Sequence, residues 1–202
     1  MISGYHPRFS LGLVLLLATA GCSKKAAESA PSTSPAAPGQ RAEQAAGIQW
    51  TAPALWARQP DRPMRVATYR IPAAPGDSED AECAAYFFGT GQGGSVEGNL
   101  SRWVSQFEPP DGRSPEQVAE ERKLTISGLN VYTLNMSGIY LASAGPMSPV
   151  TRKKPHFAML GAIVEAPQGL VFFKLTGPEK TVESASGDFN ALLQTLYLTP
   201  TT

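Results

Sequence analysis

Three glycines in segment 87–103, "FFGTGQGGSVEGNLSRW", have the spacing of a motif that holds nucleotides. Gly89, Gly91 and Gly94 satisfy G-x-G-x-x-G between an apolar run and a helical pattern, as a dinucleotide site requires. Such a site also needs an apolar parallel strand after the helix, ending in an acidic residue that binds the ribose. Here the helical pattern is followed by "EPPDGRSPEQ", in which Asp111 lies in a turn with no apolar strand before it. We therefore expect neither a nucleotide nor any other cofactor.

A phosphate-binding loop is excluded more simply, because Ser95 stands where such a loop has a lysine. The backbone conformation of a tight turn from a strand into a helix explains why glycines occur here, since glycine readily adopts the positive φ angles of such a turn. The first N–H groups of a helix nevertheless remain available to an anion. Gly93, Gly94 and Ser95 are therefore candidate anion-binding residues.

The sequence offers few candidate residues for nucleophilic catalysis or for metal binding. His156 is the only histidine beyond the first 22 residues, and no cluster of Cys and His has metal-ligand spacing. A nucleophile pair of Cys83 and His156 is conceivable, but Cys83 lies in an apolar run, where burial raises a thiol pKa and lowers its reactivity. We predict no catalytic residue and no metal site, and the sequence leaves open whether Cys83 or His156 is functional.

Charged side chains gather at two further places. Glu79, Asp80 and Glu82 are close together but lack the spacing of a calcium loop, which favours a solvated turn. The basic run Arg152–Lys154 is interpreted as a solvated loop, with contact to anionic lipid headgroups as the alternative. Glu165 follows an apolar strand pattern, and we interpret it as an exposed carboxylate rather than a general acid.

The hydrophobic pattern predicts the elements that would position these residues. Strands are expected at 48–52, 64–71 and 81–89, followed by a helix with an apolar stripe from Val96 to Phe107. A short helix capped by Ser114, four more strands and a final helix from Pro178 follow. This order predicts an α+β fold, a largely antiparallel sheet of about six or seven strands covered by two main helices.

The N-terminal segment has the pattern of a signal peptide at residues 1–21. Arg8 supplies a positive charge, and Leu11–Ala20 form an apolar stretch shorter than the roughly 20 residues that span a bilayer. The stretch ends in "TAGC", which resembles the lipobox of bacterial lipoproteins, whose cysteine is acylated and becomes the mature N-terminus. This resemblance implies lipidation of Cys22. An ordinary secretory signal with a chance cysteine is the alternative.

Composition divides the remaining chain into a tether and a domain. Residues 22–47 are rich in Ala, Pro and Ser and hold no bulky apolar side chain, which predicts a lipidated cysteine followed by a disordered tether. Residues 48–199 are predicted to form a single globular domain. The chain has 17 basic and 17 acidic residues, and without a basic excess we expect no nucleic-acid partner.

A lipid on Cys22 would hold the protein in the cell envelope, on the periplasmic side. Ser23 after the cysteine is compatible with sorting to the outer rather than the inner membrane of a Gram-negative bacterium. The expected partners are therefore the membrane, through the lipid, and an unknown envelope protein.

Two longer stretches resemble the PsbP-like fold, which includes the photosystem subunit PsbP and the Mog-type Ran-binding proteins. "IQWTAPALWARQP" (48–60) is similar to the opening strand of these proteins, and residues 170–196 are similar to their final strand and helix. Segment 87–107 also resembles a group of uncharacterised bacterial lipoproteins. The resemblance implies an α/β/α sandwich and a binding or assembly factor rather than an enzyme.

The leading hypothesis is therefore a non-catalytic, lipid-anchored binding or accessory protein of the cell envelope. The alternative is an unrecognised enzyme, or a receptor for a small ligand or anion. Its site would lie near the Gly89–Gly94 turn or beside Trp56 or Trp103, where a pocket with convergent polar groups would support it.

Overall fold

The computed structural model describes residues 42–143 and 151–200. Its strands are β1 (Ala42–Ala45), β2 (Ile48–Thr51), β3 (Ala57–Arg58), β4 (Ala67–Ile71), β5 (Ala81–Phe87), β6 (Phe107–Glu108), β7 (Glu120–Ile126), β8 (Leu129–Ser143), β9 (Thr151–Ala166), β10 (Gly169–Pro178) and β11 (Tyr197–Leu198). Its helices are α1 (Val96–Val104), α2 (Pro115–Val118), α3 (Glu179–Ser184) and α4 (Ser186–Gln194).

The strands form one large and one small sheet, both antiparallel. The large sheet has eight strands in the order β3-β4-β5-β10-β9-β8-β6, with β7 also paired to β8. The small sheet has the order β1-β2-β11. The predicted α+β class with a largely antiparallel sheet is confirmed, although the large sheet has eight strands instead of six or seven.

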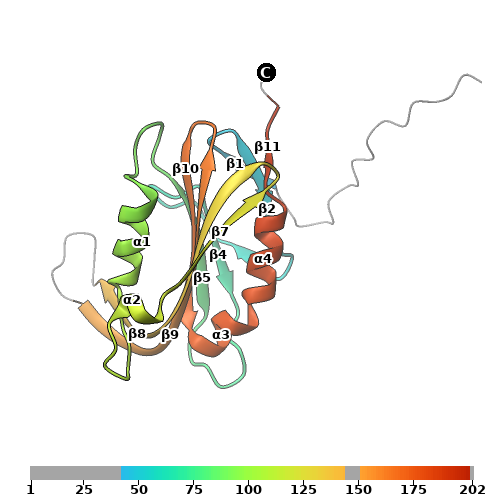
Figure 1. Cartoon of the computed structure of the whole chain (residues 1–202). Helices are drawn as coiled ribbons and strands as arrows, with labels where there is room; N and C mark the ends of the chain where they lie inside the picture. Colours follow the sequence, from blue (N-terminus) through green and yellow to red (C-terminus); the bar gives the residue numbers. More distant parts are fainter. Residues whose placement is uncertain (1–41, 144–150, 201–202) are drawn as a thin grey trace, which may run out of the picture. The chain divides into compact units, whose positions relative to one another are not determined.

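Figure 1 shows α1 on one face of the large sheet and α3 and α4 on the other. A hydrophobic core lies on each face. The small sheet, α3 and α4 cover one face, where Trp50, Phe173 and Leu192 are buried. On the other face α1 covers a smaller core that includes Trp103 and Phe172. The two faces are therefore covered unequally, and part of the α1 face stays open.

Central strand β10 supplies both cores because its side chains alternate between the faces. Phe173 belongs to the core under α4, and Phe172 to the core under α1. The same alternation places Lys174 and Thr176 on the α1 face, beyond the part that the helix covers.

Helix α1 begins as the sequence predicts and ends earlier. The hydroxyl of Ser95 accepts a hydrogen bond from the Gly98 N–H at 3.0 Å, the expected N-cap contact. The helix stops at Val104, so the prediction that Phe107 belongs to its apolar stripe is wrong. Phe107 instead pairs with Tyr140 as the first residue of β6 and is buried there. Phe107 would face the core if the helix continued to it, and it also faces the core as the first residue of β6. The apolar pattern therefore does not distinguish these two structures.

The folded domain begins six residues before the predicted boundary at residue 48, inside the segment predicted to be a tether. Strand β1 pairs with β2 through a turn in which Ala46 and Gly47 adopt positive φ angles. Backbone pairing in a hairpin needs no bulky side chain, and composition alone therefore missed this strand. The rest of the predicted tether, the signal peptide and Cys22 lie outside the described residues.

Other expectations have mixed outcomes. The capping contact of α2 is confirmed, with the Gln117 side chain accepting from the Ser114 N–H at 3.0 Å. The predicted final helix is divided into α3 and α4 at Ala185. The basic run Arg152–Lys154 is part of β9 and not of a loop, because it pairs with the extended end of β8.

Candidate functional site

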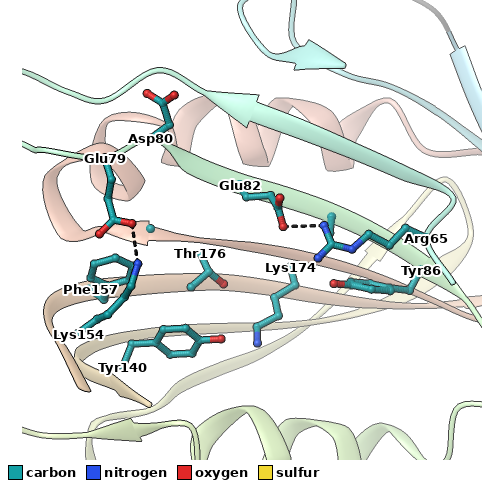
Figure 2. Close-up of a pocket in the computed structure, with 12 residues that line it drawn as sticks. Arg65, Glu79, Asp80, Glu82, Tyr86, Tyr140, Lys154, Phe157, Lys174 and Thr176 are labelled. Atoms are coloured by element: carbon teal, nitrogen blue, oxygen red, sulfur yellow. Dashed lines mark hydrogen bonds and ion pairs between the residues drawn. The ribbon is translucent and has the colours of Figure 1, made fainter. Parts of the chain in front are cut away.

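The open part of the α1 face contains a hollow of about 270 Å³ (Figure 2). We call it the Lys174 hollow. Strands β5, β8, β9 and β10 contribute its walls, and charged side chains of the 65–82 region form its rim. Its lining residues include Arg65, Glu82, Tyr86, Tyr140, Lys174 and Thr176.

Two small residues flank Lys174 in the sheet. Lys174 pairs with Ala84 of β5 on one side and with Gly161 of β9 on the other. Its ammonium group donates to the Gln106 side-chain oxygen and lies 5.5 Å from the ring centroid of Tyr140. Among the described residues no carboxylate pairs with it.

The surroundings of Lys174 disfavour its charge. Burial, and then the positive charges of Arg102 and Arg65, lower the pKa of Lys174 to about 8. Near neutral pH the side chain is therefore still charged, but it loses its proton more easily than an ordinary lysine.

Two tyrosines flank Lys174 in Figure 2, with both hydroxyl groups pointing toward it. Burial raises the pKa of Tyr86 and of Tyr140, so both phenols remain neutral hydrogen-bonding groups. The Arg65 guanidinium lies 5.5 Å from the centroid of the Tyr86 ring. Hydrogen-bond donors of β5, β8 and β10 and of Arg65 thus line the same hollow.

The acidic side chains of the rim are paired with cations, where the sequence had predicted a solvated turn. Glu79 contacts Lys154 at 2.6 Å, and Asp80 contacts Arg70 at 2.7 Å. The bond from Arg70, followed by one from the Ala73 N–H, lowers the pKa of Asp80. These pairs join the 73–80 loop to the sheet.

Glu82 is shared between two arginines. It contacts Arg65 at 2.6 Å and Arg62 at 2.9 Å. Among the residues that line the hollow, the acids Glu79, Asp80 and Glu82 balance the cations Arg65, Lys154 and Lys174 in number. Lys174 is the one of these three cations that no carboxylate of the described residues contacts.

A second hollow of about 200 Å³ lies beside Trp103, and we call it the Trp103 hollow. Its walls include Phe88 and Phe172, and Arg102 and Gln106 lie among its lining residues. Lys174 and Tyr86 line both hollows, which are therefore neighbours. The alternative hypothesis placed a site beside Trp103, and a hollow with polar groups exists there. Trp56, the other tryptophan that it named, is buried next to Tyr69.

The Thr176 hydroxyl is the least satisfied polar group of the site. Its oxygen is buried, and no hydrogen-bond partner for it exists within the described residues. An unpaired buried hydroxyl costs about 1–3 kcal/mol. A ligand or an ordered water in the Lys174 hollow would remove this cost.

The backbone angles and the packing of the turn explain why residues 93 and 94 are glycines. Gly93 and Gly94 have φ angles of 94° and 79°, and a Cβ on Gly93 would lie 3.2 Å from Phe172 and Phe88. The Asn99 amide donates to the carbonyl oxygens of Gly93 and Ser95, each at 2.7 Å. These contacts account for the sequence of the turn. Anion binding by Gly93, Gly94 and Ser95 stays a prediction.

Cys83 and His156 lie in different environments. Cys83 is fully buried in the core under α4, and burial raises the pKa of its thiol. His156 is exposed on β9 with a φ of 57°. The conceivable nucleophile pair is therefore not assembled. Within 42–143 and 151–200, no three His, Cys, Asp or Glu side chains are grouped to hold a metal ion.

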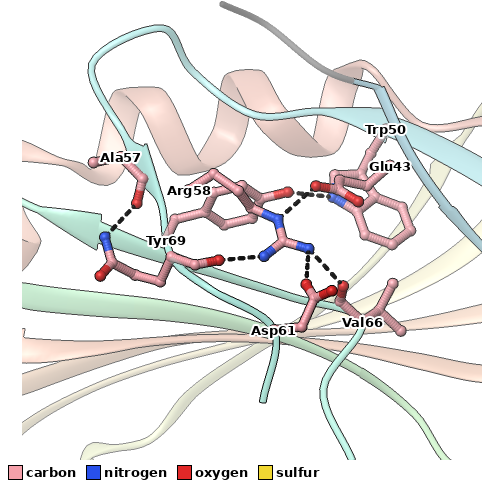
Figure 3. Close-up of polar contacts among 8 residues, drawn as sticks. Glu43, Trp50, Ala57, Arg58, Asp61, Val66 and Tyr69 are labelled. Carbon is pink, nitrogen blue, oxygen red and sulfur yellow. Dashed lines mark hydrogen bonds and ion pairs between the residues drawn. The ribbon is translucent and has the colours of Figure 1, made fainter.

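Another polar cluster, around Arg58, joins the two sheets (Figure 3). Arg58 donates to Glu43 of β1 at 2.6 Å and to Asp61 at 2.9 Å. In the same cluster the Trp50 indole donates to the Tyr69 hydroxyl at 3.3 Å. The guanidinium is engaged by these acids and by backbone carbonyls, and we interpret the cluster as structural.

Sequence reasoning missed Lys174 as a functional candidate. The stretch "LVFFKLTG" (170–177) is one of the strands that the apolar pattern predicts, and this pattern gives no weight to its single charged residue. In a strand covered on both faces, a lysine must point toward a partner or an opening, so the signal was present.

Comparisons with known proteins give structural likenesses alone. No family model and no curated protein matches the sequence. One similar solved structure is PA94 of Pseudomonas aeruginosa, a protein of unknown function, with a TM-score of 0.44 and 14% identity over 80% of this chain and 99% of that one. A second is cyanobacterial PsbP from Synechocystis sp. PCC 6803, with a TM-score of 0.47 and 11% identity over 85% of this chain and 98% of that one. A third is LpqN of Mycobacterium tuberculosis, involved in cell envelope biogenesis, with a TM-score of 0.39 and 14% identity over 76% of this chain and 83% of that one.

A PsbP is thus among the solved structures that resemble the chain. These likenesses are too distant to inform function, and the α+β class rests on the strands and helices themselves. In the part of the chain that the structure describes, no helix is long and apolar enough to cross a membrane.

Proposed function

We propose that this chain is a non-catalytic binding protein of the cell envelope, anchored by a lipid on Cys22. The observation that carries the binding role is the Lys174 hollow, where a desolvated ammonium group lacks a carboxylate partner among the described residues. Keeping such a group in an open hollow destabilises the fold unless a ligand or partner supplies negative charge. The open part of the α1 face is therefore the proposed binding surface.

The anchor is proposed from the sequence. The apolar stretch Leu11–Ala20 is too short to span a bilayer and ends at Cys22 in a lipobox-like pattern. Each buried CH₂ group contributes about 0.8 kcal/mol, and two or three acyl chains would hold the protein stably on a membrane.

Lipidation is tested by metabolic labelling with a clickable fatty acid. The wild-type chain is expected to incorporate the label and to sediment with membranes, and Cys22→Ser is expected to do neither. Cys83→Ser is the matched control, because its thiol is buried, and it should label like the wild type. Label that persists in Cys22→Ser would refute the anchor.

The binding surface is tested by site-specific photo-cross-linking in intact cells. A photoreactive residue at Arg70, exposed on the open part of the sheet, is expected to give a discrete adduct with an envelope component. The same residue at Glu183, exposed on α3 at the opposite face, is the control and should give none. Equal adducts at both positions, or none at Arg70 in correctly localised protein, would contradict the proposal.

A receptor for a small ligand is the second candidate function. It is favoured by one observation, the Trp103 hollow that shares Lys174 and Tyr86 with the Lys174 hollow.

A further inference from the structure

We propose that the two neighbouring hollows bind one small monocarboxylate that carries a flat apolar group. The carboxylate would lie at Lys174, and the apolar group beside Trp103. This inference rests on the proposed binding function and names the class of ligand. It requires neither the lipid anchor nor an envelope partner.

The charges around Lys174 favour an anion. Lys174, Arg65 and Arg102 are close enough for the arginines to lower the pKa of the lysine by mutual repulsion, after the larger effect of burial. Arg102 donates only to the Asn99 side-chain oxygen, a neutral acceptor, within the described residues. A carboxylate placed among these cations would relieve the repulsion and form charge-assisted hydrogen bonds.

Neutral donors that line the same hollow can add to the contact of Lys174 with a carboxylate. The hydroxyls of Tyr86 and Tyr140 point toward Lys174 in Figure 2, and the Thr176 hydroxyl lines the same hollow without a partner among the described residues. An ionised carboxylate has two oxygens with about four lone-pair sites. It can accept hydrogen bonds from the ammonium group and from several hydroxyls together.

The acids on the rim favour a ligand with a single negative charge, because Glu79, Asp80 and Glu82 all line the Lys174 hollow. Glu82, which binds Arg65 and Arg62, lines the Lys174 hollow. It would repel a dianion such as phosphate more strongly than a monocarboxylate.

The Trp103 hollow suits the apolar group of the ligand. Phe88 and Phe172 pack with ring centroids 5.6 Å apart, and Phe172 lies 6.3 Å from Trp103. The hollow of about 200 Å³ exceeds the roughly 150 Å³ that accommodates benzene in an engineered cavity. Aromatic walls favour a flat ring that can stack or meet them edge to face.

Calorimetric titration of the purified full chain at pH 7 tests the proposal with three probes. These are 3-phenylpropanoate, its neutral analogue 3-phenylpropanamide, and inorganic phosphate. We expect 3-phenylpropanoate to bind, and the other two to bind at least about tenfold more weakly, a difference of about 1.4 kcal/mol. Binding should also change the fluorescence of Trp103, whereas Trp50 and Trp56 are buried in the other core.

Variants identify the site. Lys174→Met should weaken 3-phenylpropanoate binding at least about tenfold, and Lys174→Arg should retain most of it because it keeps the charge. Lys180→Met, at an exposed position on α3, is the matched control and should bind like the wild type. Thermal unfolding of each variant shows that it is folded before titration.

Several outcomes overturn the inference. These are no binding of 3-phenylpropanoate, equal binding of the neutral amide, tighter binding of phosphate, and unchanged affinity in Lys174→Met. Each leaves the cross-linking test at Arg70 untouched, because that test reports contact with an envelope component. Conversely, carboxylate binding without a cross-linked adduct would remove the envelope partner and keep the ligand site.

Discussion

Replacing Lys174 with methionine is expected to increase the free energy of unfolding at pH 7 by about 1–3 kcal/mol, even though it removes the proposed ligand contact. Methionine keeps the length and apolar stem of lysine, so the packing between Ala84 and Gly161 is retained. The substitution removes an ammonium group whose pKa is lowered to about 8 by burial and by Arg102 and Arg65.

The pH dependence of the free energy of unfolding tests whether removal of the Lys174 ammonium group causes the stabilisation. The pKa of Lys174 is about 8 in the folded protein and about 10.4 in an unfolded chain. Below pH 8 the side chain is protonated in both states, and its full destabilising effect is present. Between about pH 8 and 10.4 the unfolded chain binds more protons, so the stability of the wild type rises with pH through this group.

The stability difference between Lys174→Met and the wild type should therefore be largest below about pH 8 and should decrease up to about pH 10.4. Urea denaturation followed by circular dichroism at pH 7, 9 and 10.5 measures it. Other titrating groups are common to both proteins and cancel in the difference. Lys180→Met, at an exposed position, should change stability by less than about 0.5 kcal/mol at every pH.

A destabilised Lys174→Met would mean that the contacts with Gln106 and Tyr140 outweigh the cost of desolvation. The expected stabilisation instead fits a residue retained for binding. Groups that bind ligands are commonly held at some cost to stability, and their replacement by apolar residues stabilises the fold.

The sequence predicted the helices and strands of this fold better than it predicted which strands pair with each other. The apolar stripe through Leu100 and Trp103 and the run around Cys83 each identified a buried element, because local periodicity reports which side faces a core. The strand order was beyond prediction. Strand β5 pairs with β10, about ninety residues further along, and such long-range pairing leaves no trace in local pattern.

The candidate site was predictable only in part. The sequence indicated Trp103 as a possible neighbour of a ligand site, and the Trp103 hollow lies there. The position of Lys174 in an apolar strand indicated that a charged side chain must face a partner or an opening, but the sequence does not show which of the two it is or which elements form it. The hollow also depends on the small side chain of Ala84, which pairs with Lys174 and lines the hollow, whereas Trp103 fills the space over Gly161.

Replacing Gly161 with alanine is expected to destabilise the protein by about 1–3 kcal/mol, the usual effect of overpacking a core. A Cβ at this position would lie 2.5 Å and 2.7 Å from two atoms of the Trp103 ring. Trp103 is buried against Phe172 and cannot move away without disturbing the core under α1. The indole must shift toward the Trp103 hollow or strand β9 must bend.

A double-mutant cycle in urea assigns this cost to the indole. In a Trp103→Leu background the smaller side chain leaves room for the new methyl group, so Gly161→Ala should cost at least about 1 kcal/mol less. Gly187→Ala is the control, because no atom lies within 4 Å of its added Cβ, and a helical alanine should stabilise α4 by about 0.5–1 kcal/mol. An equal cost of Gly161→Ala in both backgrounds would show that the backbone of β9, and not Trp103, demands glycine. If the cycle shows coupling, the same residue that admits Trp103 also determines how much space the Trp103 hollow retains beside Lys174.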